Sequence, residues 1–313
     1  MAINHVEIKD FLVFKGEFAL DFCSGVNVII GGNATGKTTL LKCLYDLKRL
    51  HLKYPGEVFD FDSTGSFVDG LLVVSELKSG EQERKWGTAY FTGLTKNFVY
   101  IPEKDILEHA KGLLPFIEQK QTGFSQIYKD TIVSAQDIPT SIQTDMQKNT
   151  GGLIADIVGG YIEWVQSEGT FYTVRTDGMR IPFSVEASGF KKLGYLGLLI
   201  ASGQIDTGTI LFWDEPENSL NPNLVPMLVD VLLELSRNGV QIFLATHSEI
   251  LASYFSVNRE KGDTVMFYSL YKDGEHIKAD KSGRFDLLVP NNLTLEPVRL
   301  YERKLERGLN GNG

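Results

Sequence analysis

A glycine-rich segment at residues 31–39 constrains the fold of this chain more than any other part of its sequence. It fits the pattern G-x-x-x-x-G-K-[ST] and reads Gly31-Gly32-Asn33-Ala34-Thr35-Gly36-Lys37-Thr38-Thr39. An apolar, strand-like run at residues 26–30 precedes it, and an apolar helical pattern follows over about residues 36–50. A strand, a glycine-rich loop and a helix in this order predict a P-loop, which binds phosphate groups within an α/β fold.

The residue types in this loop suit phosphate chemistry. Gly31 and Gly36 let the backbone curl so that successive N–H groups face the phosphates, and the helix that follows offers its N-terminus to the same anion. We expect Lys37, as an exposed loop residue, to reach the terminal phosphates and Thr38 to coordinate Mg²⁺. All nine residues are therefore candidates for nucleotide binding. The alternative is a glycine-rich turn with an accidental Lys-Thr pair, which the flanking strand and helix disfavour.

A second motif consists of a buried strand that ends in two acids, Ile210-Leu211-Phe212-Trp213-Asp214-Glu215. In a nucleotide site Asp214 would hold Mg²⁺, directly or through water, and Glu215 would polarise the attacking water as the catalytic base. Strands also end in solvated carboxylates that have no such role. The P-loop upstream favours the functional interpretation.

The residues after this strand indicate which class of P-loop protein the chain resembles. The segment Asp214-Glu215-Pro216-Glu217-Asn218-Ser219-Leu220-Asn221-Pro222 resembles the Walker B motif and D-loop of ABC ATPases. In particular, it is similar to the form found in the SMC-like and OLD-like branch, which includes short prokaryotic proteins of the AAA_15 and AAA_21 type. Ala245-Thr246-His247-Ser248 resembles the H-loop of that family. The resemblance implies ATP and Mg²⁺ as cofactors, and His247 as a catalytic residue beside the γ-phosphate.

The signature helix of that family is expected upstream of Walker B, where this chain has Glu186-Ala187-Ser188-Gly189-Phe190-Lys191-Lys192. This segment departs from the LSGGQ pattern, because one glycine follows the serine and Phe190 replaces the glutamine. The resemblance implies that Ser188 and Gly189 bind the ATP of a second subunit, so that ATP is sandwiched in a head-to-tail homodimer. A Ser-Gly pair at a helix start also makes an ordinary N-cap. The Q-loop is expected after residues 98–101, where Glu103 or Lys104 stands in place of the usual glutamine.

The whole pattern predicts an α/β fold: a P-loop NTPase, similar to ABC ATPases, with a mostly parallel sheet flanked by helices, an N-terminal antiparallel β part and a helical insertion. We expect residues 1–105 to form the first half of the core, residues 106–180 a helical and hairpin insertion, and residues 181–313 the second half. No element is predicted after a hairpin at residues 264–278, and a Gly/Asn tail follows Arg307. The expected strands are residues 71–74, 88–91, 98–101, 161–165, 171–175, 209–213 and 240–244, and the expected helices of the second half are residues 188–200, 224–236 and 248–255.

Composition limits the partners. Lys and Arg number 31 against 40 Asp and Glu, a formal net charge of −9, which argues against wholesale wrapping of nucleic acid but not against a local basic patch. Cys43 lies in an apolar helical pattern and Cys23 has no CxxC partner, so no disulfide is expected. The N-terminus lacks a basic segment followed by an apolar stretch, and no apolar run suits a membrane span. We therefore expect a cytoplasmic protein without a membrane partner.

Three roles for ATP hydrolysis remain open. The first is the ATPase or sensor of a prokaryotic defence or toxin–antitoxin-like system that controls a protein effector, such as a nuclease. The second is a DNA-repair or chromosome-maintenance ATPase, which the negative charge and the lack of a heptad run disfavour. The third is the nucleotide-binding subunit of a transporter, which the altered signature and Q-loop disfavour. Residues 106–180 carry no motif and are expected to face the partner.

Overall fold

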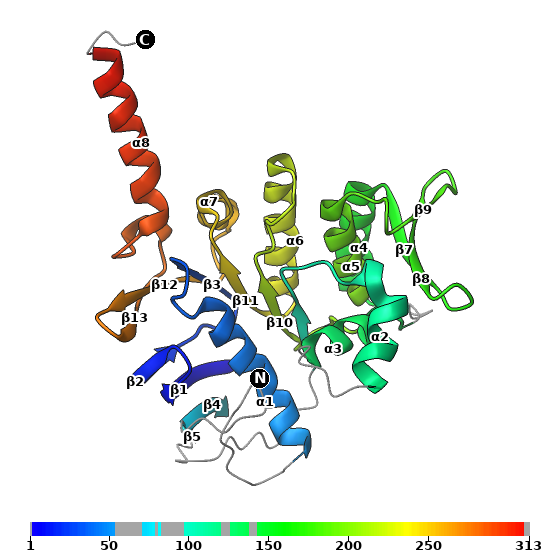
Figure 1. Ribbon diagram of the computed structural model, residues 1–313, viewed down its shortest axis with the longest axis horizontal. Helices are drawn as coiled ribbons and strands as arrows, with labels where there is room; N and C mark the ends of the chain where they lie inside the picture. The colour runs from blue at the N-terminus through cyan, green and yellow to red at the C-terminus, as the bar shows by residue number, and fades with distance from the viewer. Residues whose placement is uncertain are drawn as a thin grey trace.

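A six-stranded sheet forms the centre of the structure (Figure 1). The computed structural model describes residues 2–53, 71–78, 81–82, 97–119, 126–137 and 143–309. Neighbouring strands of the central sheet run parallel except for the last pair, β12 and β13, which are antiparallel. The prediction of a mostly parallel sheet is thus confirmed. Its strands, in spatial order, are β13 (His276–Ser282), β12 (Val265–Asp273), β3 (Val26–Gly31), β11 (Gln241–Thr246), β10 (Ile210–Asp214) and β6 (Phe98–Ile101).

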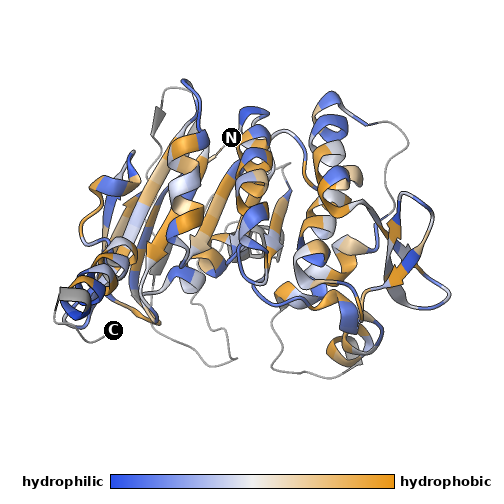
Figure 2. Ribbon diagram, turned by 90° about the horizontal axis from the view of Figure 1, so that it is seen from above, coloured by the Kyte–Doolittle hydropathy of each residue, from blue (hydrophilic) through white to orange (hydrophobic). Residues whose placement is uncertain are grey.

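Both faces of this sheet are buried, because successive side chains of each strand enter opposite layers. Ile29, Phe212 and Phe243 pack with α1 (Lys37–Lys53) on one face. Val28 and Leu244 pack on the other face, which α6 (Val225–Arg237) and α7 (Glu249–Asn258) cover. Figure 2 accordingly shows the central strands as hydrophobic along most of their length. This double burial explains why the strands read as continuous apolar runs in the sequence.

The N-terminal antiparallel part is also confirmed. Four strands pair in the order β2-β1-β4-β5 and lie on the same face of the central sheet as α1 (Figure 1). The expected strand at residues 88–91 lies outside the described residues. The strands are β1 (Ile3–Phe11), β2 (Phe14–Asp21), β4 (Leu71–Lys78) and β5 (Glu81–Gln82).

Between β6 and β10 the chain builds a helical layer that carries a small antiparallel sheet. Helix α4 (Asp145–Val158) begins with a capping box of Thr144 and Gln147 and ends at Gly159, whose φ is +70°. It packs against α5 (Ser188–Ala201), and both helices join the core on the α6 face of the central sheet. The other elements are η1 (Leu107–His109), α2 (Ala110–Gln119), α3 (Gln126–Ala135), β7 (Gly160–Val165), β8 (Thr170–Arg175) and β9 (Arg180–Pro182).

Helix α8 (Asn292–Leu309) was not predicted from the sequence. It projects from the rest of the molecule (Figure 1) and exposes an apolar stripe of Leu295, Val298, Tyr301 and Leu305. The stripe has helical spacing of three and four residues, which was an available signal, although Pro297 interrupts the pattern. Within the described ranges, no helix combines the length and apolarity needed to cross a membrane.

Candidate nucleotide-binding site

The predicted P-loop connects β3 to α1 as expected. At Gly36 the backbone φ is +92°, and a Cβ atom there would lie 2.8 Å from the ring of Phe14, so this position requires glycine. Ala34, at the exposed tip, also has a positive φ of +58° without being glycine. Thr35 Oγ1 donates a hydrogen bond to the carbonyl oxygen of Gly32 at 2.9 Å, which closes the loop on itself. Contacts within the loop therefore contribute to its conformation.

Lys37 is buried, and the expectation of an exposed loop residue is wrong. The side chain of this first residue of α1 folds back beneath the loop and retains only 6% exposure. Its Nζ donates to the carbonyl oxygens of Gly31 at 2.9 Å and Gly32 at 3.0 Å. Burial lowers the pKa of Lys37 to about 8, although the carboxylates of Glu215 and Asp214 oppose the shift. The ammonium group of Lys37 therefore lies beneath the loop, close to where the phosphates are expected to bind.

The two predicted metal ligands meet beside the loop. Thr38 Oγ1 donates to Asp214 Oδ1 at 3.2 Å, which joins the start of α1 to the end of β10. Tyr100 on β6 donates to the other oxygen, Oδ2, at 3.4 Å. Burial raises the pKa of Asp214, while its hydrogen bond from Thr38 lowers it. A hydroxyl and a carboxylate are the oxygen ligands that Mg²⁺ prefers, so the residues present fit this ion.

Glu215 and His247 also come together, because they follow the neighbouring strands β10 and β11. His247 Nε2 lies 3.3 Å from Glu215 Oε1. Burial raises the pKa of Glu215, and the carboxylates of Glu103 and Glu217 raise it further. Burial lowers the pKa of His247, as does the nearby charge of Lys37. A carboxyl group with a raised pKa is better able to accept a proton from water than an ordinary carboxylate.

Two further acidic residues belong to the site: Glu217, which was given no role from the sequence, and Glu103, which was named there only as a candidate at the Q-loop position. Glu217 Oε1 accepts hydrogen bonds from Thr246 Oγ1 at 2.5 Å and from the backbone N–H of His247 at 3.1 Å. Glu103, one of the two candidates at the Q-loop position, accepts from Asn218 Nδ2 at 3.1 Å. Their position could have indicated this, because Glu103 follows β6 and Glu217 follows β10, and the carboxyl ends of parallel strands lie at the same edge of a sheet.

Ser188 and Gly189 stand apart from this cluster. Ser188 is the exposed first residue of α5, and in the described part of the chain no hydrogen bond or ion pair joins its side chain to residues 31–39. The N-cap is Ala187, without a side-chain cap, so the N-cap interpretation of Ser188 is wrong. Gly189 is buried against Ser219 and Leu220. The structure therefore unites the P-loop with the strand-end residues but leaves the Ser-Gly pair outside that group.

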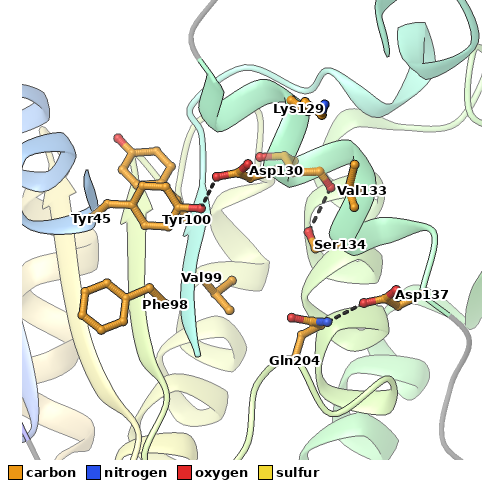
Figure 3. Close-up of a pocket in the computed structure, with 11 residues that line it drawn as sticks. Tyr45, Phe98, Val99, Tyr100, Lys129, Asp130, Val133, Ser134, Asp137 and Gln204 are labelled. Carbon is orange, nitrogen blue, oxygen red and sulfur yellow. Dashed lines mark hydrogen bonds between the residues drawn. The ribbon is translucent and has the colours of Figure 1, made fainter. Parts of the chain in front are cut away.

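A separate cavity of about 340 Å³ lies between α1, β6 and α3 (Figure 3). Its two carboxylates are hydrogen-bonded: Asp130 accepts from Tyr45 Oη at 2.7 Å, and Asp137 accepts from Gln204. Tyr100 lines this cavity and also contacts Asp214, so one ring separates the cavity from the candidate metal site. The P-loop residues do not line it.

Comparisons with known proteins agree with this geometry. Residues 102–253 match the AAA domain family AAA_21, whose description names the AbiEii toxin and the type IV TA system. Residues 5–45 match a second AAA domain family, AAA_23. The DNA replication and repair protein RecF of Oenococcus oeni (strain ATCC BAA-331 / PSU-1) is 45% identical over 47 residues. That match covers 15% of this chain and 12% of RecF.

Solved structures share the fold at low sequence identity. An SMC head bound to the C-winged helix domain of ScpA superposes with a TM-score of 0.52 at 13% identity, covering 90% of this chain and 98% of that one. A nucleotide-free ATP-binding cassette from an ABC transporter gives 0.50 at 14% identity, covering 95% and 98%. The fold and the site define a P-loop protein of the ABC ATPase class. Together with the two family matches and the short RecF match, these likenesses support an SMC- and RecF-like P-loop protein of the ABC ATPase type, as the motifs predicted.

Proposed function

We propose that this chain hydrolyses ATP with the help of Mg²⁺. The observation that carries the proposal is the convergence of Lys37, Thr38, Asp214, Glu215 and His247 at one edge of the central sheet. Bound Mg²⁺, held by Thr38 and Asp214, would neutralise phosphate charge. Glu215 would take a proton from the attacking water, and His247 beside it would contact the γ-phosphate. Lys37 would exchange its two loop carbonyls for phosphate oxygens.

Release of inorganic phosphate from Mg-ATP by the purified protein tests this proposal. Lys37→Ala should abolish release and weaken ATP binding, because the phosphates lose their principal cation. Since Lys37 is buried, the thermal unfolding temperature of the variant must be measured beside its activity. A folded Lys37→Ala protein with near-normal turnover would contradict the P-loop assignment. Removal of Mg²⁺ with EDTA should stop turnover of the wild type.

We further propose that two copies sandwich ATP. The resemblance to ABC ATPases supports this arrangement, and so does the position of Ser188, which is exposed at the start of α5 and unconnected to its own chain's P-loop. In a head-to-tail pair, Ser188 and Gly189 of one copy would face the nucleotide held by Lys37 of the other. The N-terminus of α5 would then direct its amides towards the γ-phosphate.

For the biological role, we propose an ATPase or sensor that controls an effector in a prokaryotic defence or toxin–antitoxin-like system. The match of residues 102–253 to a family described by a toxin of the type IV TA system supports it. Residues 106–180 would form the partner-facing module of this system. The test is a phage-challenge assay on cells that carry the native locus. Protection lost in Lys37→Ala cells would support the role, and equal survival with and without the locus would contradict it.

A second candidate is DNA maintenance, which the short match to RecF favours. A purified protein of this kind should bind DNA with an affinity that falls steeply as salt rises, because counterions are released from phosphates. Mobility-shift titrations at two salt concentrations measure this directly. The net charge of −9 predicts weak binding unless basic residues gather locally.

A further inference from the structure

Two adjacent lysines of α5, Lys191 and Lys192, are almost completely buried, with 5% and 6% exposure. They reach different parts of the molecule. Lys191 forms ion pairs with Glu108 at 2.5 Å and Asp105 at 3.4 Å. Lys192 Nζ instead donates to the backbone carbonyl oxygen of Glu215 at 3.1 Å. The ammonium group of Lys192 therefore contacts the main chain of Glu215, the proposed catalytic base.

The backbone of Glu215 needs such support. Its φ is +47°, in the left-handed region that residues with a side chain rarely occupy. Pro216 follows, and a proline pushes the residue before it towards extended conformations. The N–H of Glu215 donates to the carbonyl oxygen of Ala245 at 2.8 Å, so β11 holds the peptide group before the residue. Lys192 holds the peptide group after it.

A second contact on the same face of α5 fixes the distance between helix and loop. Gly189 lies one turn before Lys192, where a Cβ atom would sit 3.2 Å from both Ser219 O and Leu220 Cδ1. The helix can therefore approach residues 215–220 closely, which lets the Lys192 side chain reach the Glu215 carbonyl. Burial lowers the pKa of Lys192, while the nearby carboxylates of Glu217 and Glu103 oppose this shift.

We propose that Lys192 is a positioning residue for Glu215: by holding the Glu215 carbonyl it keeps the backbone left-handed and the carboxylate aimed at the attacking water. The inference rests on the proposed ATP hydrolysis. Because α5 begins at Ser188, the same helix ties the end that would meet a second subunit's nucleotide to the base of its own site. Nucleotide bound at the site of one subunit would then influence the position of Glu215 in the other subunit.

Lys192→Met tests this, since methionine has similar length and no donor. We expect kcat to fall about 10- to 100-fold, by analogy with the loss of a residue that orients a metal ligand, with the ATP Kd almost unchanged. In a Glu215→Gln background the same substitution should lower the residual rate no further, because the group it positions is already disabled. If Lys192 had a purely structural role, Lys192→Met would lower the rate by the same factor in the wild type and in the Glu215→Gln variant, and that result would overturn the proposal. A wild-type kcat in Lys192→Met would also overturn it.

Lys191→Met is the matched control, because it removes a buried lysine from the same turn of α5 without touching Glu215. Its kcat should stay within about threefold of wild type, with any loss appearing in thermal stability instead. If Lys192→Met does not fold, Lys192→Arg keeps a donor and should retain most of kcat. A folded Lys192→Arg as inactive as Glu215→Gln would refute the inference. Absence of hydrolysis by the wild type would refute the proposed function itself.

Discussion

At the scale of single residues, the ammonium group of Lys37 shows how burial prepares a site for an anion. This group donates hydrogen bonds to two carbonyl oxygens, which are weaker partners than phosphate. Its pKa is about 8, below the ordinary value of 10.5. The folded protein therefore binds fewer protons than the unfolded chain between these two pH values. As pH rises through that window, the contribution of Lys37 to the free energy of unfolding increases. Over the same window Lys37 loses its charge and with it the electrostatic attraction for ATP.

ATP binding should accordingly be coupled to proton uptake. Near pH 8 about half of the Lys37 side chains are neutral, and a bound polyphosphate should recharge them, so about half a proton is taken up per site. At about pH 6 Lys37 is already charged and its share of the uptake should vanish. Isothermal titration calorimetry in buffers of different ionisation enthalpy measures the uptake. The pH 8 component should be missing in Lys37→Ala, and its persistence there would contradict the assignment.

His247→Ala should lower turnover much more than ATP affinity. One contact near the γ-phosphate matters most as charge develops there, so we expect a loss in kcat of at least about tenfold with a small change in Kd. His276→Ala is the control, because His276 sits on β13 and bonds the Lys15 carbonyl. Wild-type affinity and turnover in His247→Ala would mean that His247 is structural.

At the scale of elements, local patterns predicted most of what the structure contains. The P-loop and its flanking strand and helix could be predicted because glycine positions and apolar periodicity are local properties. The contacts of Lys192 and Glu217 could not, because they join residues 23 and 29 positions apart through side chains whose geometry exists only after folding. Burial of Lys37 could not be predicted either, although its partners Gly31 and Gly32 are close in sequence, because it depends on how the loop folds over the side chain. Helix α8 was missed for another reason, because Pro297 interrupts the helical spacing of its apolar residues.

Two elements compete as the partner-facing surface, and paired substitutions separate them. Tyr161 on β7 and Met179 near β9 are exposed apolar residues of the 106–180 segment, at 60% and 53% exposure. Changing both to Glu should leave basal ATP hydrolysis and thermal stability unchanged and abolish the partner's effects. Val298→Glu with Tyr301→Glu alters the exposed stripe of α8 in the same way. If only the α8 pair abolishes those effects, the proposal for residues 106–180 is wrong.

At the scale of the whole molecule, Glu215→Gln should trap the proposed dimer. The substitution removes the carboxylate that polarises water, while Lys37 and Asp214 still hold Mg-ATP, so bound ATP persists. Binding that favours the dimer shifts association by mass action, and light scattering should show the dimer only with ATP and Mg²⁺. Adding Ser188→Arg should return the protein to monomer with modestly reduced ATP affinity. Ser188 is exposed, so its own chain accommodates the larger side chain.

An ATP-independent dimer unaffected by Ser188→Arg would contradict the sandwich and place the association on another surface. Alanine at the same position is the size control, because it removes the hydroxyl without adding a cation. The Glu215→Gln, Ser188→Ala protein should still dimerise with Mg-ATP, though at higher protein concentration.

The position of β3 in the sheet has a consequence for how the protein is made. The strand that carries the P-loop lies between β11 and β12, which the ribosome produces about 200 residues later. Until they emerge, β3 has two unpaired edges, and such edges invite pairing with other chains. A fragment that ends at residue 240 should therefore sediment as aggregate and retain no fluorescent ATP analogue, although it contains the whole P-loop. We therefore expect the chain to become able to bind nucleotide only after β11 and β12 have been made, so a chain interrupted before them should not compete with longer chains for ATP.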